Sequence, residues 1–203
     1  MDGSAAPFLV LVEEAGLRSQ AVPRKVLKIV KPFRYQSQGK SMSAEPGTQF
    51  SVSYEIHFDH PLIRSQRKTV VLDSTGYENQ IAPARTFGFL KDVNYLKSKG
   101  LIRGGSLENA VVLDGDRILN ESLRFKDEFV SHKILDMVGD LAIGGYRLQG
   151  HFRAEKAGHE VHALFLKALL AADDCYRIVT EKAETEAAVP ATSVTESFAG
   201  AGL

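Results

Sequence analysis

The sequence predicts an α+β fold with two layers, a sheet and a set of helices packed on one face of it. Residues 50–58 alternate between apolar and polar side chains, and this period of two indicates a strand with one buried face. The longest helical pattern covers residues 127–143 and is followed by Gly144 and Gly145. Predicted strands are grouped before predicted helices, which favours α+β layers.

The composition suits one ordinary globular domain with a short appended segment. The chain has 203 residues, of which 44% are hydrophobic and 25% are charged. Lys and Arg together number 25, as do Asp and Glu, so no net charge attracts the protein to nucleic acid or to an anionic membrane. The single cysteine, Cys175, cannot form an internal disulfide, which fits a reducing compartment.

The first residues show no targeting signal. They carry no basic cluster, and the apolar run at 8–12 is too short for a signal peptide. No apolar stretch in the sequence approaches the roughly 20 residues that cross a bilayer. We therefore expect a cytoplasmic protein without a membrane span.

The first half of the chain is expected to form a short helix followed by strands. The helix covers about 8–15, with Ser4 as its N-cap and Gly16 at its end. Strands are predicted at 24–30, 50–58 and 68–72, and the turn Asp59-His60-Pro61 ends the second of them. These strands should form a mostly antiparallel sheet.

The second half is expected to add three helices and three strands. The helices are predicted at 90–99, 127–143 and 158–172, and the strands at 110–113, 117–119 and 146–154. Gly100 ends the first of these helices, and Asp114-Gly115 forms a tight turn. After Thr180, the residues Ala, Thr, Glu, Ser and Gly dominate, so 181–203 is expected to be a disordered tail.

The predicted helix at 127–143 carries the side chains best suited to chemistry. Residues four apart project from one face of a helix, so His132 and Asp136 can reach the same point, with Asp140 one turn later. Imidazole and carboxylate suit zinc, but two ligands make only part of a site. The spacing alone favours a solvated polar stripe of Glu128, His132, Asp136 and Asp140, because such pairs are common.

Two further segments contain groups that could contact a ligand. At the start of the last helix, His159 could be a general acid or base, because histidine ordinarily titrates near neutral pH. A solvent-bonded helix residue is the simpler explanation of His159, and His162 is expected to be structural. Thr86 could donate a hydrogen bond to an oxyanion and Phe87 could stack on a sugar, although Phe87 could equally be a core residue.

Other classes of function lack their motifs. The sequence contains no glycine-rich phosphate loop, no G-x-S-x-G motif and no C-x-x-C pair. The LDGD at 113–116 is shorter than a calcium loop. Nucleic-acid binding is not expected, because no basic stripe with interleaved aromatic residues is present.

Six segments of the sequence belong together. They are, in chain order, MDGSAAPF at 1–8, FDHP at 58–61, ARTFGF at 84–89, GGS at 104–106, RFKDEFVSHKILDMVGDL at 124–141 and KAGH at 156–159. In this order they resemble the UDP-3-O-acyl-N-acetylglucosamine deacetylases, which act in lipid A biosynthesis in Gram-negative bacteria. The chain is thereby identified as a member of that family.

The resemblance implies two similar domains, each a sheet with packed helices, whose helical layers face each other across the active site. Residues 1–22 would be the closing helix of the first domain and a linker. Residues 23–180 would be the second domain, with a small β-α-β insert at about 88–113. The rest of the first domain would be the missing packing partner.

The resemblance also implies a zinc-dependent hydrolase. Such an enzyme removes the N-acetyl group from UDP-3-O-(3-hydroxyacyl)-N-acetylglucosamine and releases acetate. His132 and Asp136 would bind Zn²⁺, and Thr86 would contact the substrate oxyanion. His159 would be the general acid that protonates the leaving amine, and Asp140 would orient His159.

Further positions are implied to bind the substrate. Phe87 would contact the glucosamine ring, Lys133 and Lys156 the nucleotide end, and Phe58 the uracil. The acyl chain would lie along apolar residues of the insert, namely Leu90, Val93, Ile102, Leu107 and Ala110.

The sequence departs from the family pattern in one respect. In the family, one zinc ligand and the glutamate general base lie in an H-x-E-H segment of the first domain, which this sequence does not contain. The HEVH at 159–162 has a different order and belongs to the KAGH motif. We therefore expect weak activity or none from the chain alone. The alternative function is a non-catalytic module that binds acyl-sugar nucleotides.

Overall fold

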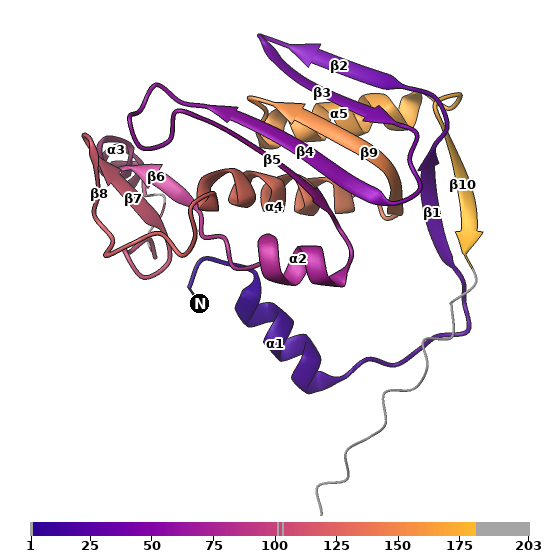
Figure 1. Ribbon diagram of the computed structural model, residues 1–203, viewed down its shortest axis with the longest axis horizontal. Coiled ribbons are helices and arrows are strands. Elements are labelled where there is room, and N and C mark those ends of the chain that lie inside the picture. The colour runs from indigo at the N-terminus through magenta and orange to yellow at the C-terminus, as the bar shows by residue number, and fades with distance from the viewer. Residues whose placement is uncertain (1, 101, 103, 182–203) are drawn as a thin grey trace, which may run out of the picture.

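The computed structural model describes residues 2–100, 102 and 104–181, and within them a seven-stranded sheet forms the centre of the molecule (Figure 1). The strands of this sheet are β1 (Arg24–Ile29), β2 (Phe33–Ser37), β3 (Lys40–Glu45), β4 (Phe50–His57), β5 (Ser65–Val71), β9 (Arg147–Glu155) and β10 (Tyr176–Glu181). Helices α4 (Glu128–Ala142) and α5 (His159–Ala171) lie along one face of the sheet. The predicted α+β layers are confirmed.

Strand β9 joins the sheet together because it pairs with three other strands. It runs parallel to β1 and β4 and antiparallel to β3. The outer pairs β1–β10, β2–β3 and β4–β5 are all antiparallel, so the prediction of a mostly antiparallel sheet is confirmed. Gly150 stands where β9 changes partners, with a φ of 147°. A Cβ at this position would lie 2.9 Å from Glu45 O, so a larger residue would push the strands apart.

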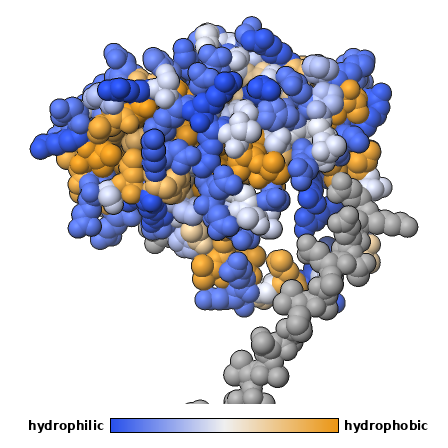
Figure 2. Space-filling view, in the orientation of Figure 1, coloured by the Kyte–Doolittle hydropathy of each residue, from blue (hydrophilic) through white to orange (hydrophobic). Residues whose placement is uncertain are grey.

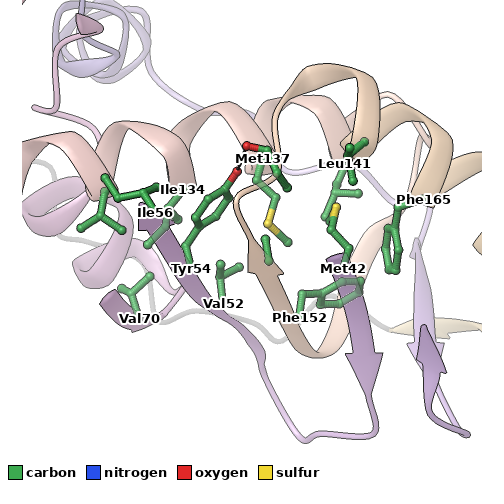
Figure 3. Close-up of a cluster of buried hydrophobic side chains, with 14 of the residues drawn as sticks. Met42, Val52, Tyr54, Ile56, Val70, Ile134, Met137, Leu141, Phe152 and Phe165 are labelled. Carbon is green, nitrogen blue, oxygen red and sulfur yellow. Dashed lines mark hydrogen bonds between the residues drawn. The ribbon is translucent and has the colours of Figure 1, made fainter. Parts of the chain in front are cut away.

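The hydrophobic core lies between the sheet and the two long helices (Figure 3). The alternation along β4 directs Val52, Tyr54 and Ile56 toward the helices, and all three are buried. Ile134, Met137 and Leu141 of α4 and Phe165 of α5 close over them. This packing fixes how α4 and α5 sit relative to each other, and it is their contact that assembles the site.

A smaller sheet forms the predicted β-α-β insert. It consists of β6 (Phe87–Phe89), α3 (Leu90–Ser98), β7 (Val111–Asp114) and β8 (Arg117–Ile118), with β6 and β7 parallel and α3 as the crossover. His60, in the turn after β4, lies with its Nε2 2.6 Å from Gly115 O. The ring of Phe58 meets that of Phe87 edge to face at a centroid distance of 5.5 Å. These contacts attach the insert to the main sheet.

The amino-terminal segment is attached by backbone hydrogen bonds. The N–H groups of Ala5 and Ala6 both donate to Ala82 O, just after α2 (Ser74–Gln80). Helix α1 (Ala6–Ala15) begins after Ala5 without a side-chain cap, so the predicted N-cap, Ser4, is wrong. The Ser4 hydroxyl donates to Asp2 at 2.8 Å, and its oxygen accepts the N–H of Ala6 at the longer distance of 3.4 Å.

Apolar side chains on α1 are exposed in the described structure. Phe8 is 53% exposed and Leu11 is 55% exposed. Figure 2 shows apolar residues gathered at the bottom of the view, where α1 lies, and at the left, where the insert lies.

Three strands and one helix were not predicted from the sequence, namely β2, β3, β10 and α2. The predicted tail lies, from residue 182 onward, outside the described residues. Within the described part of the chain, every helix is too short or too polar to cross a bilayer.

Candidate metal and acid–base site

Helix α4 carries two side chains that could share a cation. His132 Nε2 lies 3.2 Å from Asp136 Oδ1, one helical turn away. The other ring nitrogen, Nδ1, lies 3.2 Å from Ala84 O, and because a carbonyl only accepts, Nδ1 carries the hydrogen. The Nε2 lone pair then faces a carboxylate oxygen. Such a contact is favourable with a proton on Nε2 or with a metal ion bound by both groups, so this donor pair fits zinc.

The surroundings of Asp136 keep it ionised. Burial raises the pKa of its carboxyl, but the hydrogen bond and charge of His132 and the charge of Lys133 outweigh burial, and the pKa falls below the ordinary range. Lys133 Nζ donates to Asp136 Oδ2 at 2.6 Å. The side chains of His132 and Asp136 are 12% and 14% exposed, and Glu128 is fully buried. The expectation of a solvated stripe is therefore wrong for these three residues.

Helix α5 brings a second imidazole to the same place. His159 is the first residue of α5, and its side chain is 69% exposed. Its Nδ1 lies 2.7 Å from Asp140 Oδ2, and its Nε2 lies 3.8 Å from Asp136 Oδ2. His132, Asp136 and His159 therefore converge, although they lie on two helices.

Asp140 contacts a further histidine. His162, on the same helix as His159, is fully buried, and its Nδ1 lies 2.7 Å from Asp140 Oδ2. Burial lowers the pKa of His162, more than the hydrogen bond to Asp140 raises it.

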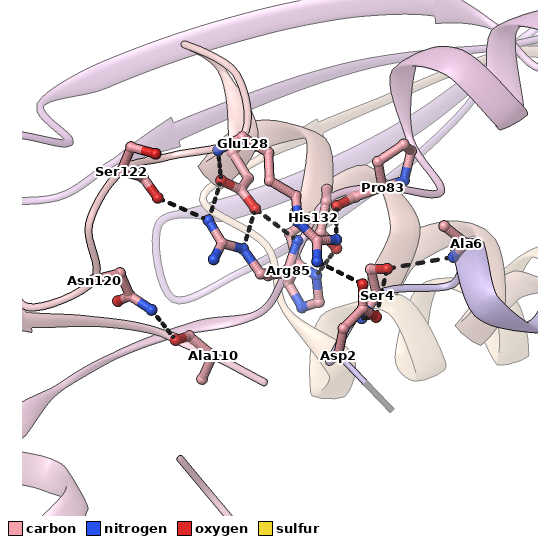
Figure 4. Close-up of polar contacts among 12 residues, drawn as sticks. Asp2, Ser4, Ala6, Pro83, Arg85, Ala110, Asn120, Ser122, Glu128 and His132 are labelled. Carbon is pink, nitrogen blue, oxygen red and sulfur yellow. Dashed lines mark hydrogen bonds and ion pairs between the residues drawn. The ribbon is translucent and has the colours of Figure 1, made fainter. Parts of the chain in front are cut away.

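Glu128 fixes the loop beside His132 (Figure 4). Its carboxylate accepts the backbone N–H of Arg85 at 3.0 Å, Arg85 Nε at 2.8 Å and the backbone N–H of Arg124 at 2.8 Å. The N–H of Arg85 belongs to the same peptide group as Ala84 O, which faces His132 Nδ1. One peptide group therefore links Glu128 to the orientation of His132.

The converging groups line a cavity of about 370 Å³ between α4 and the insert. Its lining residues are Phe58, Thr86, Phe87, Gly88, Phe89, Asp92, Val93, Leu96, His132, Lys133, Asp136 and His159. Helices α4 and α5 contribute ionic and imidazole groups to this lining, whereas the insert contributes aromatic and aliphatic side chains together with Asp92.

Comparison with known families accounts for this arrangement. The family model described as UDP-3-O-acyl N-acetylglycosamine deacetylase matches residues 1–171. The chain belongs to this deacetylase family. Curated proteins named UDP-3-O-acyl-N-acetylglucosamine deacetylase are 46% identical over 181 residues in Thermodesulfovibrio yellowstonii, 46% over 189 in Nautilia profundicola and 45% over 193 in Shewanella sp. strain W3-18-1.

These relatives are longer than the chain. The alignments cover 89%, 93% and 94% of this chain but 62%, 64% and 62% of the respective relatives. The chain therefore spans less than two thirds of the length of the curated deacetylases that it matches.

Most site residues expected of this deacetylase family member come together in the structure. Eight of the twelve residues that line the cavity were predicted, and Asp140 contacts one of them, His159. Five predicted substrate residues lie outside the lining, namely Lys156, Leu90, Ile102, Leu107 and Ala110. Lys156 and Leu107 are exposed, and their roles stay predictions.

A second set of possible metal ligands lies beside the first. Ligand atoms of Asp140, His159 and His162 all lie within 4.8 Å of one another. Both Nδ1 atoms are already hydrogen-bonded to the Asp140 carboxylate. In the deacetylase-family site this set therefore forms a hydrogen-bonded group around the Asp140 carboxylate.

Sequence reasoning missed several residues of the site. Phe89 and Leu96 line the cavity, and their signals were the alternation in ARTFGF and the helical spacing of Leu96 from Val93. Asp92, one residue before Val93, also faces the cavity. The burial of Glu128 had no sequence signal, because its partner Arg85 is 43 residues away in the chain.

Proposed function

We propose that the chain belongs to a zinc-dependent hydrolase that removes the N-acetyl group from UDP-3-O-acyl-N-acetylglucosamine and releases acetate, in the cytoplasm, for lipid A biosynthesis. The observation that carries this proposal is the convergence of His132, Asp136 and His159 at one end of the cavity. The names of the relatives support the substrate. The single cysteine agrees with a reducing compartment.

His132 Nε2 and the Asp136 carboxylate would hold the zinc ion. Zinc bound there would supply Lewis-acid polarisation of the acetyl carbonyl and a lower pKa for water. The Ala84 carbonyl keeps the hydrogen of His132 on Nδ1, so that Nε2 stays available as a ligand.

His159 would act as the general acid. An amide nitrogen must gain a proton before it can leave as an amine, and the exposed His159 Nε2 faces the cavity beside Asp136. Asp140 accepts a hydrogen bond from His159 Nδ1 and stabilises the protonated ring with its negative charge. Asp140 therefore orients the His159 ring through Nδ1, and Nε2 stays open to the cavity.

The remaining lining fits the parts of the substrate. The Thr86 hydroxyl would donate to the oxyanion, and Phe87 would contact the sugar ring. Lys133 and Lys156 would contact the nucleotide end, and Phe58 the uracil. The acyl chain would lie along the insert, where Val93 lines the cavity.

We propose further that this site is completed by groups from outside the chain. A catalytic zinc site commonly uses three protein ligands, and α4 offers two. The described residues that line the cavity include no second carboxylate beside Asp136 other than Asp92, which lies on the insert helix. A third ligand and a general base would therefore come from another protein segment. The chain alone would show weak activity or none.

Acetate release tests the proposal. The chain would be incubated with Zn²⁺ and UDP-3-O-acyl-N-acetylglucosamine, alone and with the part of the Thermodesulfovibrio yellowstonii relative that the chain does not match. We expect acetate release that requires the added part and is lost with His159→Ala. Binding of the substrate without acetate release in either case would favour the non-catalytic module.

A further inference from the structure

His162 is a buried histidine to which the proposed reaction gives no part. It lies three residues after His159 on α5, and its side chain is fully buried. Buried polar groups need hydrogen-bond partners, and the two ring nitrogens of His162 have them on different elements. Nδ1 lies 2.7 Å from Asp140 Oδ2 on α4, and Nε2 lies 3.0 Å from the Tyr54 hydroxyl on β4.

Two imidazoles share one carboxylate oxygen. Asp140 Oδ2 lies 2.7 Å from His162 Nδ1 and 2.7 Å from His159 Nδ1. In the Asp140–His162 contact the imidazole is fully buried. In the Asp140–His159 contact the imidazole is 69% exposed. Because the buried contact cannot exchange its partner for water, it determines where the carboxylate points.

The hydrogen-bond partners define which nitrogen of each ring carries hydrogen. An ionised carboxylate only accepts, so Nδ1 of both His159 and His162 donates to Asp140. The Tyr54 hydroxyl donates its single hydrogen to Ala157 O, so Nε2 of His162 is the donor in its contact with the Tyr54 oxygen. Burial raises the pKa of Tyr54, so its hydroxyl keeps the hydrogen that it donates to Ala157 O.

Tyr54 connects this group to the sheet. Its hydroxyl lies 2.9 Å from Ala157 O as well as 3.0 Å from His162 Nε2. Ala157 immediately precedes Gly158, the residue before α5. The start of the helix that carries His159 is therefore held against a fully buried side chain of β4.

We propose that His162 is a positioning residue that, through Asp140, holds the His159 imidazole with Nδ1–H turned inward and Nε2 turned toward the cavity. This inference rests on the proposed role of His159 in proton transfer. A histidine that delivers a proton needs a fixed ring orientation, and a carboxylate that is itself anchored provides it.

The unmodified chain gives the first test. Long-range ¹H–¹⁵N correlation spectra of the ¹⁵N-labelled protein, recorded above the pH at which histidines titrate, distinguish protonated from unprotonated ring nitrogens. We expect hydrogen on Nδ1 of both His159 and His162. An unprotonated Nδ1 on His162 would overturn the proposal, because Nδ1 could then not donate to Asp140.

A matched pair of variants gives the second test. His162→Asn places an amide near the position of Nδ1, where it can donate to Asp140, whereas His162→Gln places its amide nearer to Nε2 and Tyr54. We expect His159 to keep its Nδ1–H form in the Asn variant. In the Gln variant the His159 Nδ1 resonance should shift toward the unprotonated range. Unchanged His159 resonances in a folded Gln variant would overturn the proposal.

These measurements need neither zinc nor turnover. Should the Gln variant fail to fold, the spectra of the unmodified chain still decide the matter. Expected spectra without acetate release under any condition would reject the proposed function and leave the role of His162 in orienting His159 intact. Acetate release together with an unprotonated Nδ1 on His162 would support the proposed function and reject the role of His162.

Discussion

At the scale of single residues, Glu128 shows how a buried charge can be tolerated beside the site. Moving a lone carboxylate into the protein interior is strongly unfavourable, but this one accepts hydrogen bonds from two backbone N–H groups and from the Arg85 guanidinium. Burial raises the pKa of Glu128, and these partners, Arg85 foremost, bring it below the ordinary value.

Removing the charge of Glu128 should destabilise the protein. Glu128→Gln keeps the shape but turns an acceptor into an N–H donor that faces other donors, and it leaves Arg85 without its counter-charge. We expect a loss of about 3–5 kcal/mol in the free energy of unfolding, measured by urea denaturation. The control Glu108→Gln, at an exposed position, should change it by less than about 0.5 kcal/mol. Equal effects of the two substitutions would contradict this account of Glu128.

The same residue predicts how stability depends on pH. The folded-state pKa of Glu128 lies below its unfolded value, so the ionised carboxylate stabilises the fold above the unfolded pKa, and this contribution is lost as the pH falls through the folded pKa. The stability difference between the unmodified chain and Glu128→Gln should therefore be largest at neutral pH and shrink below about pH 4.3. The midpoints of urea denaturation of both proteins, measured at several pH values, give this stability difference. A stability difference that grows as the pH falls would contradict the stabilising role of the ionised Glu128.

At the scale of elements, α4 contributes both to the core and to the cavity lining, and one position in it is not optimal for a helix. Gly139 is exposed, and nothing lies within 4 Å of the place where its Cβ would be. Gly139→Ala should stabilise the protein by about 0.5–1 kcal/mol, because alanine loses less backbone entropy in a helix.

Thermal unfolding measures this effect, with Gly150→Ala as the contrasting variant. Gly150 has a φ of 147°, and a Cβ added there would lie 2.9 Å from the backbone oxygen of Glu45, so its substitution should lower the unfolding temperature. The account of both glycines fails if Gly139→Ala lowers stability as much as Gly150→Ala.

The elements differ in how far their sequences reveal them. Strand β4 and helix α4 could be predicted because their apolar residues repeat with clear periods over a long stretch. Strands β2 and β3 were missed because few of their residues are apolar, and their pairing with each other and with β9 depends on contacts distant in the sequence. Helix α2 was missed because its seven residues are mostly polar and its N-cap, Asp73, is the main local signal.

The residues of the site also differ in how far the sequence alone predicts their positions. His132, Asp136 and His159 were expected from the family resemblance, while their spacing alone favoured a solvated stripe. The structure brings them together because the core packs α4 against α5. The shared contact of His162 and His159 on Asp140 depends on the angle between these helices, which no local sequence pattern specifies.

At the scale of the whole molecule, the exposed face of α1 stands out against a well-packed core. Phe8, Leu11 and Val12 are each about half exposed, and such contiguous apolar surface is typical of contact sites. Leu11→Glu should reduce the binding of a hydrophobic dye such as ANS to the folded chain without altering its free energy of unfolding by more than about 0.5 kcal/mol. The control Glu14→Gln, at an exposed position of the same helix, should leave dye binding unchanged. Equal dye binding by all three proteins would show that α1 is not the exposed apolar surface.

We propose that His132 and Asp136 bind the metal ion, whereas His159 lies beside the ion without binding it. Calorimetric titration of Zn²⁺ into the folded chain tests this most directly, with His132→Ala, Asp136→Ala and His159→Ala compared under the same conditions. The first two variants should lose affinity by about tenfold or more, and His159→Ala should bind as the unmodified chain does. Equal losses in all three variants, or none in the first two, would contradict the account.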